Sequence, residues 1–415
     1  MAKIDDSVKK SPELRFKGFT DDWEERKLGE LANIVGGGTP STSNPEYWDG
    51  DIDWYAPAEI GEQSYVSKSK KTITELGLKN SSARILPVGT VLFTSRAGIG
   101  NTAILAKEAT TNQGFQSIVP DQNKLDSYFI FSRTNELKRY GEVTGAGSTF
   151  VEVSGKQMSK MSIIVPELSE QQKIGLFFKH LDDTITLHQR KLDLLKEQKK
   201  GFLQKMFPKN GAKVPELRFK GFTDDWEERK LSDVANHRGG TAIEKYFDKD
   251  GVYKVISIGS YGLNSQYVDQ NIRAISNEIT DGQVVNSGEL TMVLNDKTAN
   301  GTIIGRTLLV EKDNEYVINQ RTEIISPKEN FDSSFAYTIL NGPFREKVKR
   351  IVQGGTQIYV NYSTVSNLNL ELPKIEEQQK IGSFFKQLDD TIALHQRKLD
   401  LLKEQKKGFL QKMFI

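Results

Sequence analysis

The sequence predicts an α+β fold, built as a tandem pseudo-two-fold repeat of two α/β domains. Each domain is followed by a long helix, and the two helices are expected to pair as an antiparallel coiled coil. Two observations predict this: two blocks of sequence occur twice in the 415 residues, and one of them carries an unbroken heptad pattern. Between the copied blocks lie divergent stretches with short strand-like runs and one helix-like stretch each, over 127–140 and 334–351.

The repeat is large. Residues 12–28 recur unchanged at 215–231, and residues 170–207 recur at 377–414 with three differences in 38 positions. The offsets of 203 and 207 are far longer than the period of a solenoid repeat. Each unit is therefore large enough to be a domain with an appended helix.

These repeats predict the domain boundaries. The first domain is expected over 1–165, with its copied start at 12–28, and the first helix over 166–208. A linker with Pro, Gly and Lys nearby follows at 209–214. The second half is expected to repeat this order, with a domain over 215–372 that begins with the copied start 215–231, and a helix over 373–415.

The copied helix has the pattern of a coiled coil. From Ile174 to Met206, seam positions recur every four and three residues, and eight of the ten are apolar. Ser169 with Gln172 predicts a capping box at the start of the helix, and Pro208 ends it. About 37 residues at about 1.5 Å per residue make a rod of about 55 Å.

Two such helices in one chain pair most simply with each other. A parallel pair would force the short linker and the second domain to span the whole rod, so we expect an antiparallel pair. Its midpoints then meet, which predicts that His188 and His395 approach each other. Polar seam residues that fix the register are the simplest interpretation. A metal or pH-switch role is the alternative, although two histidines without carboxylate or thiol neighbours make a poor zinc site.

Composition excludes several classes of protein. There is no cysteine, which excludes disulfide scaffolds, cysteine zinc sites and iron–sulfur clusters. The four histidines form no HExxH motif, and no phosphate-binding GxxxxGK[ST] loop occurs. The first ten residues lack the apolar core of a signal peptide, and no run approaches the roughly 18 apolar residues of a membrane span. We expect a cytoplasmic protein without catalytic machinery of its own.

The divergent stretches contain loops suited to DNA contact. In each half a glycine-bearing loop follows a predicted strand, at 91–93 and at 290–294, and a second glycine loop follows later. Arginine can pair with guanine and asparagine with adenine, while hydroxyl groups hold phosphate. Ordinary hairpin turns are the alternative interpretation. The candidate DNA-binding residues are Thr94, Ser95, Arg96, Asn101, Thr102, Ser148, Thr149, Asn295, Lys297, Thr298, Asn300, Arg306, Thr356 and Gln357.

The whole chain resembles the DNA specificity subunit of type I restriction–modification systems. The resemblance rests on two divergent domains, each followed by a near-identical helix. It also rests on the helix starts VPELSEQQKI and LPKIEEQQKI, on two WEERKL segments and on the Asn-Gln pairs at 112–113 and 319–320. The net charge of +2 by itself indicates no partner.

The resemblance implies that each variable domain is a target recognition domain that reads one half of an asymmetric bipartite sequence in double-stranded DNA. The helices would act as a ruler between the half-sites. The copied segments would dock two modification subunits, which methylate adenine N6, and two restriction subunits would join the complex. It implies no cofactor in this chain, with S-adenosylmethionine, Mg²⁺ and ATP on the partners, and no membrane partner.

Two other functions remain open from the residues alone. One is a self-contained nuclease or methyltransferase, which the missing motifs disfavour. The other is a coiled-coil adaptor whose globular heads bind protein or glycan.

Overall fold

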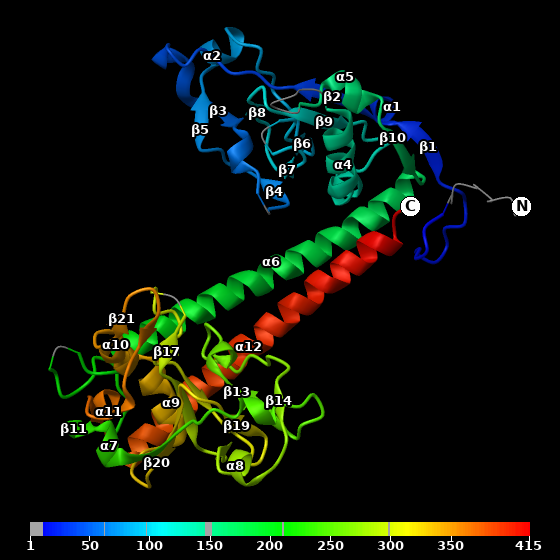
Figure 1. Ribbon diagram of the computed structural model, residues 1–415. Helices are drawn as coiled ribbons and strands as arrows, with labels where there is room; N and C mark the ends of the chain where they lie inside the picture. Colours follow the sequence, from blue (N-terminus) through cyan, green and yellow to red (C-terminus); the bar gives the residue numbers. More distant parts are fainter. Residues whose placement is uncertain (1–10, 62, 97, 146–151, 210, 298) are drawn as a thin grey trace, which may run out of the picture. The chain divides into compact units, whose positions relative to one another are not determined.

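The computed structural model describes residues 11–61, 63–96, 98–145, 152–209, 211–297 and 299–415. The chain divides into two compact units, Met1–Gln189 with Arg397–Ile415 and Arg190–Gln396. The division falls inside the two long helices, α6 (Leu168–Lys205) and α12 (Ile375–Lys412). Each unit therefore contains the N-terminal half of one long helix and the C-terminal half of the other (Figure 1).

The first unit is a mixed α/β domain around a five-stranded sheet with the order β2-β9-β6-β7-β4. The unit also contains a three-stranded sheet with the order β5-β3-β8 and the two-stranded pair β1-β10. The strands are β1 (Glu24–Lys27), β2 (Ala32–Gly36), β3 (Trp48–Tyr55), β4 (Tyr65–Val66), β5 (Lys71–Ile73), β6 (Val91–Phe93), β7 (Thr102–Leu105), β8 (Thr110–Thr111), β9 (Gln116–Pro120) and β10 (Ser162–Val165). The helices before α6 are α1 (Leu28–Leu31), η1 (Pro45–Tyr47), η2 (Pro57–Glu59), α2 (Glu75–Lys79), α3 (Ser127–Ser132), α4 (Thr134–Thr144) and α5 (Gly155–Ser159).

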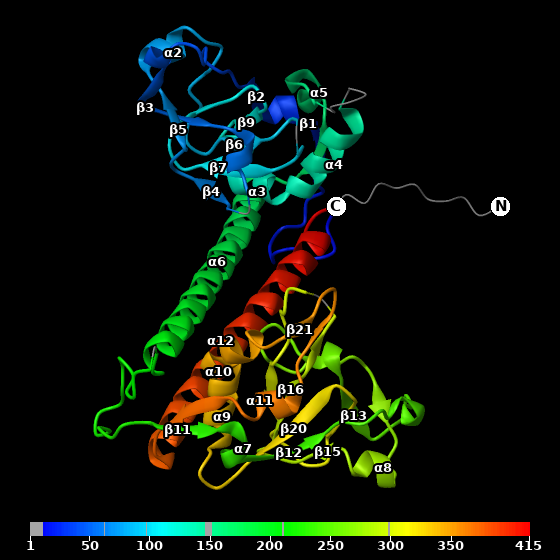
Figure 2. The ribbon, with the colours of Figure 1, turned by 60° about the vertical axis from the view of Figure 1, so that its left-hand side comes forward.

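The second unit has two four-stranded sheets, β12-β20-β16-β18 and β14-β13-β19-β15, with the smaller sheet β17-β22-β21 and the pair β11-β23 (Figure 2). Its strands are β11 (Glu227–Lys230), β12 (Ala235–Gly239), β13 (Tyr253–Ile256), β14 (Arg273–Ala274), β15 (Val284–Val285), β16 (Leu290–Val293), β17 (Asn295–Asp296), β18 (Thr307–Leu309), β19 (Tyr316–Ile318), β20 (Thr322–Pro327), β21 (Gln353–Gly354), β22 (Ile358–Tyr359) and β23 (Asn369–Leu372). Its shorter helices are α7 (Leu231–Val234), η3 (Glu244–Tyr246), η4 (Ile258–Ser260), α8 (Glu278–Asp281), α9 (Ser333–Asn341), α10 (Pro343–Lys349) and α11 (Tyr362–Val365).

Each copied start is joined to the strand that leads into a long helix. β1 pairs with β10 and β11 pairs with β23, both antiparallel. Arg15 then places Nε and Nη2 2.7 Å from the two carboxylate oxygens of Glu170 in the first turn of α6. Arg218 and Glu377 make the same bidentate pair in the second unit. Bidentate arginine–carboxylate pairs are strong and directional, so they hold the two copied blocks together as one surface in each unit.

The long helices run antiparallel within each unit, as the sequence predicts. In the first unit Lys406 of α12 lies 2.5 Å from Asp182 of α6. In the second unit Lys199 of α6 lies 2.5 Å from Asp389 of α12. In each case a residue early in one helix faces a residue late in the other, which requires opposite directions. Both units make the same contact with the copies exchanged.

The burial of α6 follows the predicted heptad seam. The seam positions, all buried or half-buried, are Ile174, Phe178, Leu181, Ile185, His188, Leu192, Leu195, Lys199, Phe202 and Met206. Leu187 and Leu194, which lie off the seam, are 67% and 52% exposed. The approach of His188 to His395 would join residues from the two units and stays a prediction.

The core of each unit is completed by the end of the other copy's helix. In the first unit the ring of Trp23 packs edge-on against Phe414, with centroids 6.4 Å apart. In the second unit Trp226 packs edge-on against Phe207 at 5.9 Å. All four side chains come from copied blocks, so the duplication gives each unit an equivalent aromatic contact that completes its core.

The predicted capping box at Ser169 is wrong. The carbonyl of Glu167 accepts the first helical hydrogen bonds, from the N–H groups of Glu170 and Gln171 at 3.1 Å. Since Glu167 is the last residue before the helix, Ser169 lies inside the first turn. Its hydroxyl donates to the carboxylate of Glu167 at 2.6 Å instead of capping a helical N–H.

The helix-like stretch predicted in each divergent region is split into two helices. Residues 127–140 fall into α3 and α4, which meet at Arg133. Residues 334–351 fall into α9 and α10, with Pro343 at the start of α10. Proline has no N–H to donate to the preceding turn, so it begins a new helix more easily than it continues an old one.

Candidate nucleic-acid interface

One end of the main sheet in the second unit gathers three segments. β16 ends at Val293, opposite Thr322, the first residue of β20. Gly239, the last residue of β12, lies opposite Glu323 in β20. Because neighbouring strands are antiparallel, the chain after β16, before β20 and after β12 leaves the sheet at the same end. We call this end, in either unit, the sheet-end interface.

A β-hairpin joins the sheet-end interface of the second unit. β17 follows β16 directly and pairs with β22, with Asn295 opposite Tyr359. β22 turns back onto β21, so the two predicted glycine loops lie in one small sheet. The predicted residues exposed there are Lys297, Asn300, Thr356 and Gln357. Tyr359, which the sequence analysis missed, is 40% exposed in the same sheet.

The first unit builds this end from the same backbone contacts. β2, β9 and β6 are neighbours in its sheet, as β12, β20 and β16 are in the second. After β6, the N–H of Ser95 donates to the carbonyl of Gly114 at 2.8 Å. The carbonyl of Ser95 in turn accepts from the N–H of Val153 at 3.1 Å.

The second unit repeats both hydrogen bonds with other residues. The N–H of Leu294 donates to the carbonyl of Arg321 at 3.0 Å, and its carbonyl accepts from Val360 at 2.9 Å. Leu294 therefore stands where Ser95 stands in the first unit. The next residues, Arg96 and Asn295, occupy equivalent positions in the two interfaces.

Three predicted residues of the first loop are internal. Thr94 is 1% exposed, and its hydroxyl donates to the carbonyl of Gly98 at 2.7 Å and accepts from the N–H of Asn101 at 2.9 Å. Ser95 is fully buried. The hydroxyl of Thr102 lies 2.6 Å from that of Thr134. The hydroxyl groups of Thr94 and Thr102 hold the shape of the loop.

Arg96 and Asn101 are the predicted residues that this loop presents outward. The side chain of Arg96 is 36% exposed, and its nearest carboxylate, that of Glu152, lies 3.9 Å from Nη1. Such a long, partly exposed contact is weak. Asn101 is exposed. The guanidinium of Arg96 is therefore available to a ligand at modest cost.

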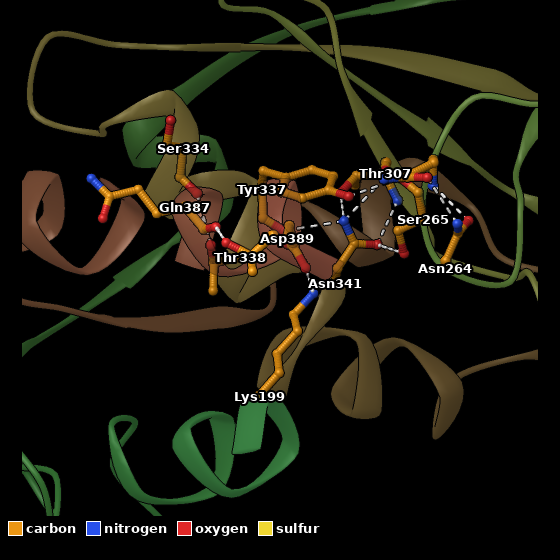
Figure 3. A network of polar contacts seen from close by, with 12 residues as sticks. Lys199, Asn264, Ser265, Thr307, Ser334, Tyr337, Thr338, Asn341, Gln387 and Asp389 are labelled. Atoms are coloured by element: carbon orange, nitrogen blue, oxygen red, sulfur yellow. Dashed lines mark hydrogen bonds and ion pairs between the residues drawn. The ribbon is translucent and has the colours of Figure 1, made fainter. Parts of the chain in front are cut away.

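Arg306 lies at the base of the second loop, where it braces the backbone. Its Nε donates to the carbonyl of Thr302 and its Nη1 to the hydroxyl of Ser265, both at 2.9 Å. The hydroxyl of Ser265 also donates to Asn341 at 2.8 Å, and Asn341 bonds the backbone of Thr307 (Figure 3). Burial lowers the pKa of Arg306. Ser148, Thr149 and Thr298 lie outside the described residues.

Close glycine approaches fix the third segment of each interface. A Cβ on Gly37 would come 2.0 Å from the carbonyl oxygen of Asn112, and one on Gly240 would come 2.1 Å from that of Asn319. Only glycine allows such a contact. The exposed Gln113 and Gln320, which follow these asparagines, thereby join the interface. The shared Asn-Gln pairs were the signal in the sequence.

A cluster of polar and aromatic side chains borders the interface of the second unit. Nδ1 of His237 lies 2.6 Å from a carboxylate oxygen of Glu323, and the ring of Tyr362 lies 4.6 Å from that of His237. Burial raises the pKa of Glu323, and the hydrogen bond from His237 opposes this rise. The first unit has no such pair at the corresponding strands, where Gln116 faces Gly36.

The described part of the chain shows no group of three or more His, Cys, Asp or Glu side chains arranged to hold a metal ion. Within the same residues, every helix is too short or too polar to cross a lipid bilayer.

Comparison with known proteins identifies the family. The sequence model of the type I restriction modification DNA specificity domain matches the chain twice, over residues 20–197 and 223–404. The chain belongs to this family. The predicted resemblance is confirmed, and the chain is a specificity component whose family leaves catalysis to partner subunits.

Some relatives of this specificity chain match it over nearly its whole length, and others over less than half of it. It is 28% identical to the specificity subunit of the type I restriction enzyme MjaIX of Methanocaldococcus jannaschii, over 94% of this chain and 92% of the relative. It is 31% identical to the EcoR124I/EcoR124II specificity subunit of Escherichia coli, over 39% and 41%. The crystal structure of an S subunit from M. genitalium has the same fold, with a TM-score of 0.66, 12% identity and coverage of 98% and 99%.

Proposed function

We propose that this chain reads an asymmetric bipartite DNA sequence, with one sheet-end interface on each half-site, and so directs adenine-N6 methylation and restriction by partner subunits. One observation carries the proposal. The two interfaces share their strand neighbours and backbone hydrogen bonds but carry different side chains, as at Arg96 and Asn295. A common frame with different side chains is what two readers of different bases require.

Within the first interface we assign base contact to Arg96 and Asn101. Arginine can donate two hydrogen bonds to guanine O6 and N7, and asparagine can pair with adenine N6 and N7. Thr94, Ser95 and Thr102 would position the loop, since their side chains are buried. In the second interface we assign DNA contact to Asn295, Lys297, Asn300, Thr356 and Gln357, with Arg306 bracing the loop. Ser148, Thr149 and Thr298 remain candidates on their sequence positions.

The helices would set the distance between the half-sites. Half-sites that face one side of B-DNA lie about 34 Å apart, or a multiple of that distance. We propose recognition domains over 1–165 and 215–372, helices over 166–208 and 373–415, and a linker over 209–214. With these boundaries the helices, and not the reading loops, separate the two contacts.

We further propose that the copied surfaces dock two modification subunits. Copies of one partner need like surfaces, and the copied blocks supply them. Leu187 and Leu194 of α6 are exposed, and so are their copies Leu394 and Leu401, at 58% and 54%. Leucines seven residues apart on one helix face suit a partner helix. Two restriction subunits would complete the complex, with S-adenosylmethionine, Mg²⁺ and ATP on the partners, in the cytoplasm with the chromosome.

The experiment is co-expression with the modification subunit from the same operon, in a host that lacks such systems, followed by genome-wide mapping of N6-methyladenine. We expect an asymmetric bipartite motif with a fixed gap, and no methylation when either chain is expressed alone. Native mass spectrometry of the complex should give two modification subunits per specificity chain. A stable complex that leaves the genome unmethylated and binds no duplex would favour an adaptor instead.

A further inference from the structure

In the first unit the arginine of the reading loop lies beside a glycine. A Cβ built on Gly114 would come 3.5 Å from Nε of Arg96. The same Cβ would also crowd Asn112 and Pro57, each at 2.9 Å. The side chain of Arg96 thus runs across the position where residue 114 would carry a side chain of its own.

In the second unit the arginine occupies the other of these two positions. The residue at the position of Gly114 is Arg321, because its carbonyl accepts the hydrogen bond from Leu294 just as that of Gly114 accepts the bond from Ser95. The residue at the position of Arg96 is Asn295. The arginine therefore stands in the loop after β6 in the first unit and in the turn before β20 in the second.

The backbone of Arg321 is in a conformation that favours glycine. Its φ is +67°, in the left-handed region. Its side chain is exposed, and within the described residues its guanidinium makes no hydrogen bond or ion pair. Neither packing nor pairing explains an arginine here. Strained backbone of this kind clusters at functional sites.

We infer that Arg321 is a specificity-determining residue, which reads a base of the second half-site with the guanidinium that Arg96 supplies in the first. This inference rests on the proposed function, since it assigns Arg321 to the DNA interface. Each unit would present one guanidinium at the equivalent place, from the loop after β6 in the first unit and from the turn before β20 in the second. A guanine edge is the matching base, because it offers two acceptors to the guanidinium.

Arg321→Gly is the decisive variant. Glycine adopts the left-handed conformation without strain, so we expect the thermal midpoint of the complex to stay unchanged or to rise. We expect the methylation motif of the R321G complex to relax at one position of the second half-site, with the first half-site unchanged. Binding to the original duplex should weaken roughly 5- to 150-fold, with a loss that disappears on duplexes altered at that base.

Two controls match this variant. Asn314 also has a positive φ, of +57°, in the segment between β18 and β19, which leaves the sheet at the end opposite the interface. N314G tests the backbone change alone, and R350A removes an exposed arginine elsewhere in the unit. Neither should change the motif. In R321G/N295R the arginine returns to the loop position found in the first unit, and we expect recovery of part of the lost affinity.

The outcomes separate this inference from the proposed function. If the wild-type complex gave no bipartite motif, the proposed function would fail before any variant was compared. If the wild type gave the motif and R321G gave it unchanged, only the role of Arg321 would be refuted. Equal weakening on all duplexes would refute base reading, and R321G/N295R binding no better than R321G would refute the equivalence of the two positions.

Discussion

Nζ of Lys406, near the end of the second long helix, lies 2.5 Å from a carboxylate oxygen of Asp182, in the first half of the first long helix. The hydroxyl of Tyr128 donates to the other oxygen of that carboxylate at 2.8 Å. The copies Lys199 and Asp389 make the same ion pair in the second unit. Two pairs with exchanged copies fix the register of the antiparallel helices in each unit.

Removal of one lysine should destabilise the second unit. Burial raises the pKa of Asp389, and Lys199 opposes the rise. K199M would leave this half-buried carboxylate without its partner, and we expect a loss of about 1–2 kcal/mol in the free energy of unfolding, discounted for partial exposure. Denaturant titration measures it. K199M/D389N should recover most of the loss, and equal stability of the single and double variants would contradict the assignment.

The loss in K199M should depend on pH. A raised pKa in the folded protein means that the folded state takes up its proton at a higher pH than the unfolded chain. As pH falls from the raised pKa toward the ordinary value of 3.8, stability is therefore gained at this site. Without Lys199 the pKa of Asp389 should rise further, so K199M begins to gain stability at a higher pH than the wild type. We expect the gap between K199M and wild type to narrow as pH falls toward the wild-type pKa and to stay constant below it. A gap that widens on acidification would show the opposite sign of coupling.

A chain of residues 1–208, the first half of the protein, should form a homodimer. The N–H of Leu14 donates to the carbonyl of Lys412, and that of Leu217 to the carbonyl of Lys205, each at 2.8 Å. A chain of residues 1–208 carries both a copied start and a copied helix end, so two molecules can complete each other's cores. Light scattering should give a dimer. A chain of residues 1–189, which lacks the helix end, should not dimerise, and a folded monomer of 1–208 would contradict the exchange.

Arg96→Ala should weaken the first half-site only. Loss of a bidentate base contact costs about 1–3 kcal/mol of binding free energy and relaxes one base position. Competition binding on duplexes with single substitutions measures both effects. Lys107 follows β7 at the opposite end of the sheet, so K107A is the control and should leave the motif unchanged. A uniform loss on all sequences would assign Arg96 to phosphate.

Exchange of the variable stretches should exchange half-sites. We expect a chain in which 29–165 is replaced by 232–372 to methylate a motif whose first half has become a copy of the second. The copied starts and helices stay in place, so the gap should stay close to its original length. Mapping of N6-methyladenine reads both halves at once, and changes in both halves would contradict independent readers.

Lengthening both helices by one heptad should lengthen the gap. Seven residues add about 10 Å to a helix, which is the length of about three base pairs. The heptad keeps the seam in phase, and the half-sites should stay unchanged. A four-residue insertion, which breaks the phase, serves as the control and should disrupt assembly. An unchanged gap in the heptad variant would refute the ruler.

The sequence by itself determined the repeat, the long helices and the family. Identical blocks and a heptad period are local, one-dimensional signals, and seam residues such as Phe178 and Leu192 are buried as the pattern predicts. The antiparallel direction also followed from the sequence, because a short linker cannot span a rod.

Only the tertiary structure decided which loop residues face outward. Thr94 and Ser95 read as candidate phosphate ligands, yet hydrogen bonds with Gly98, Asn101 and Gly114 place them inside. The equivalence of Arg96, in the loop after β6, with Arg321, in the turn before β20, could not be read from the sequence either. Exposure depends on strands that lie far apart in the chain but adjacent in the sheet, and a local pattern carries no record of those neighbours.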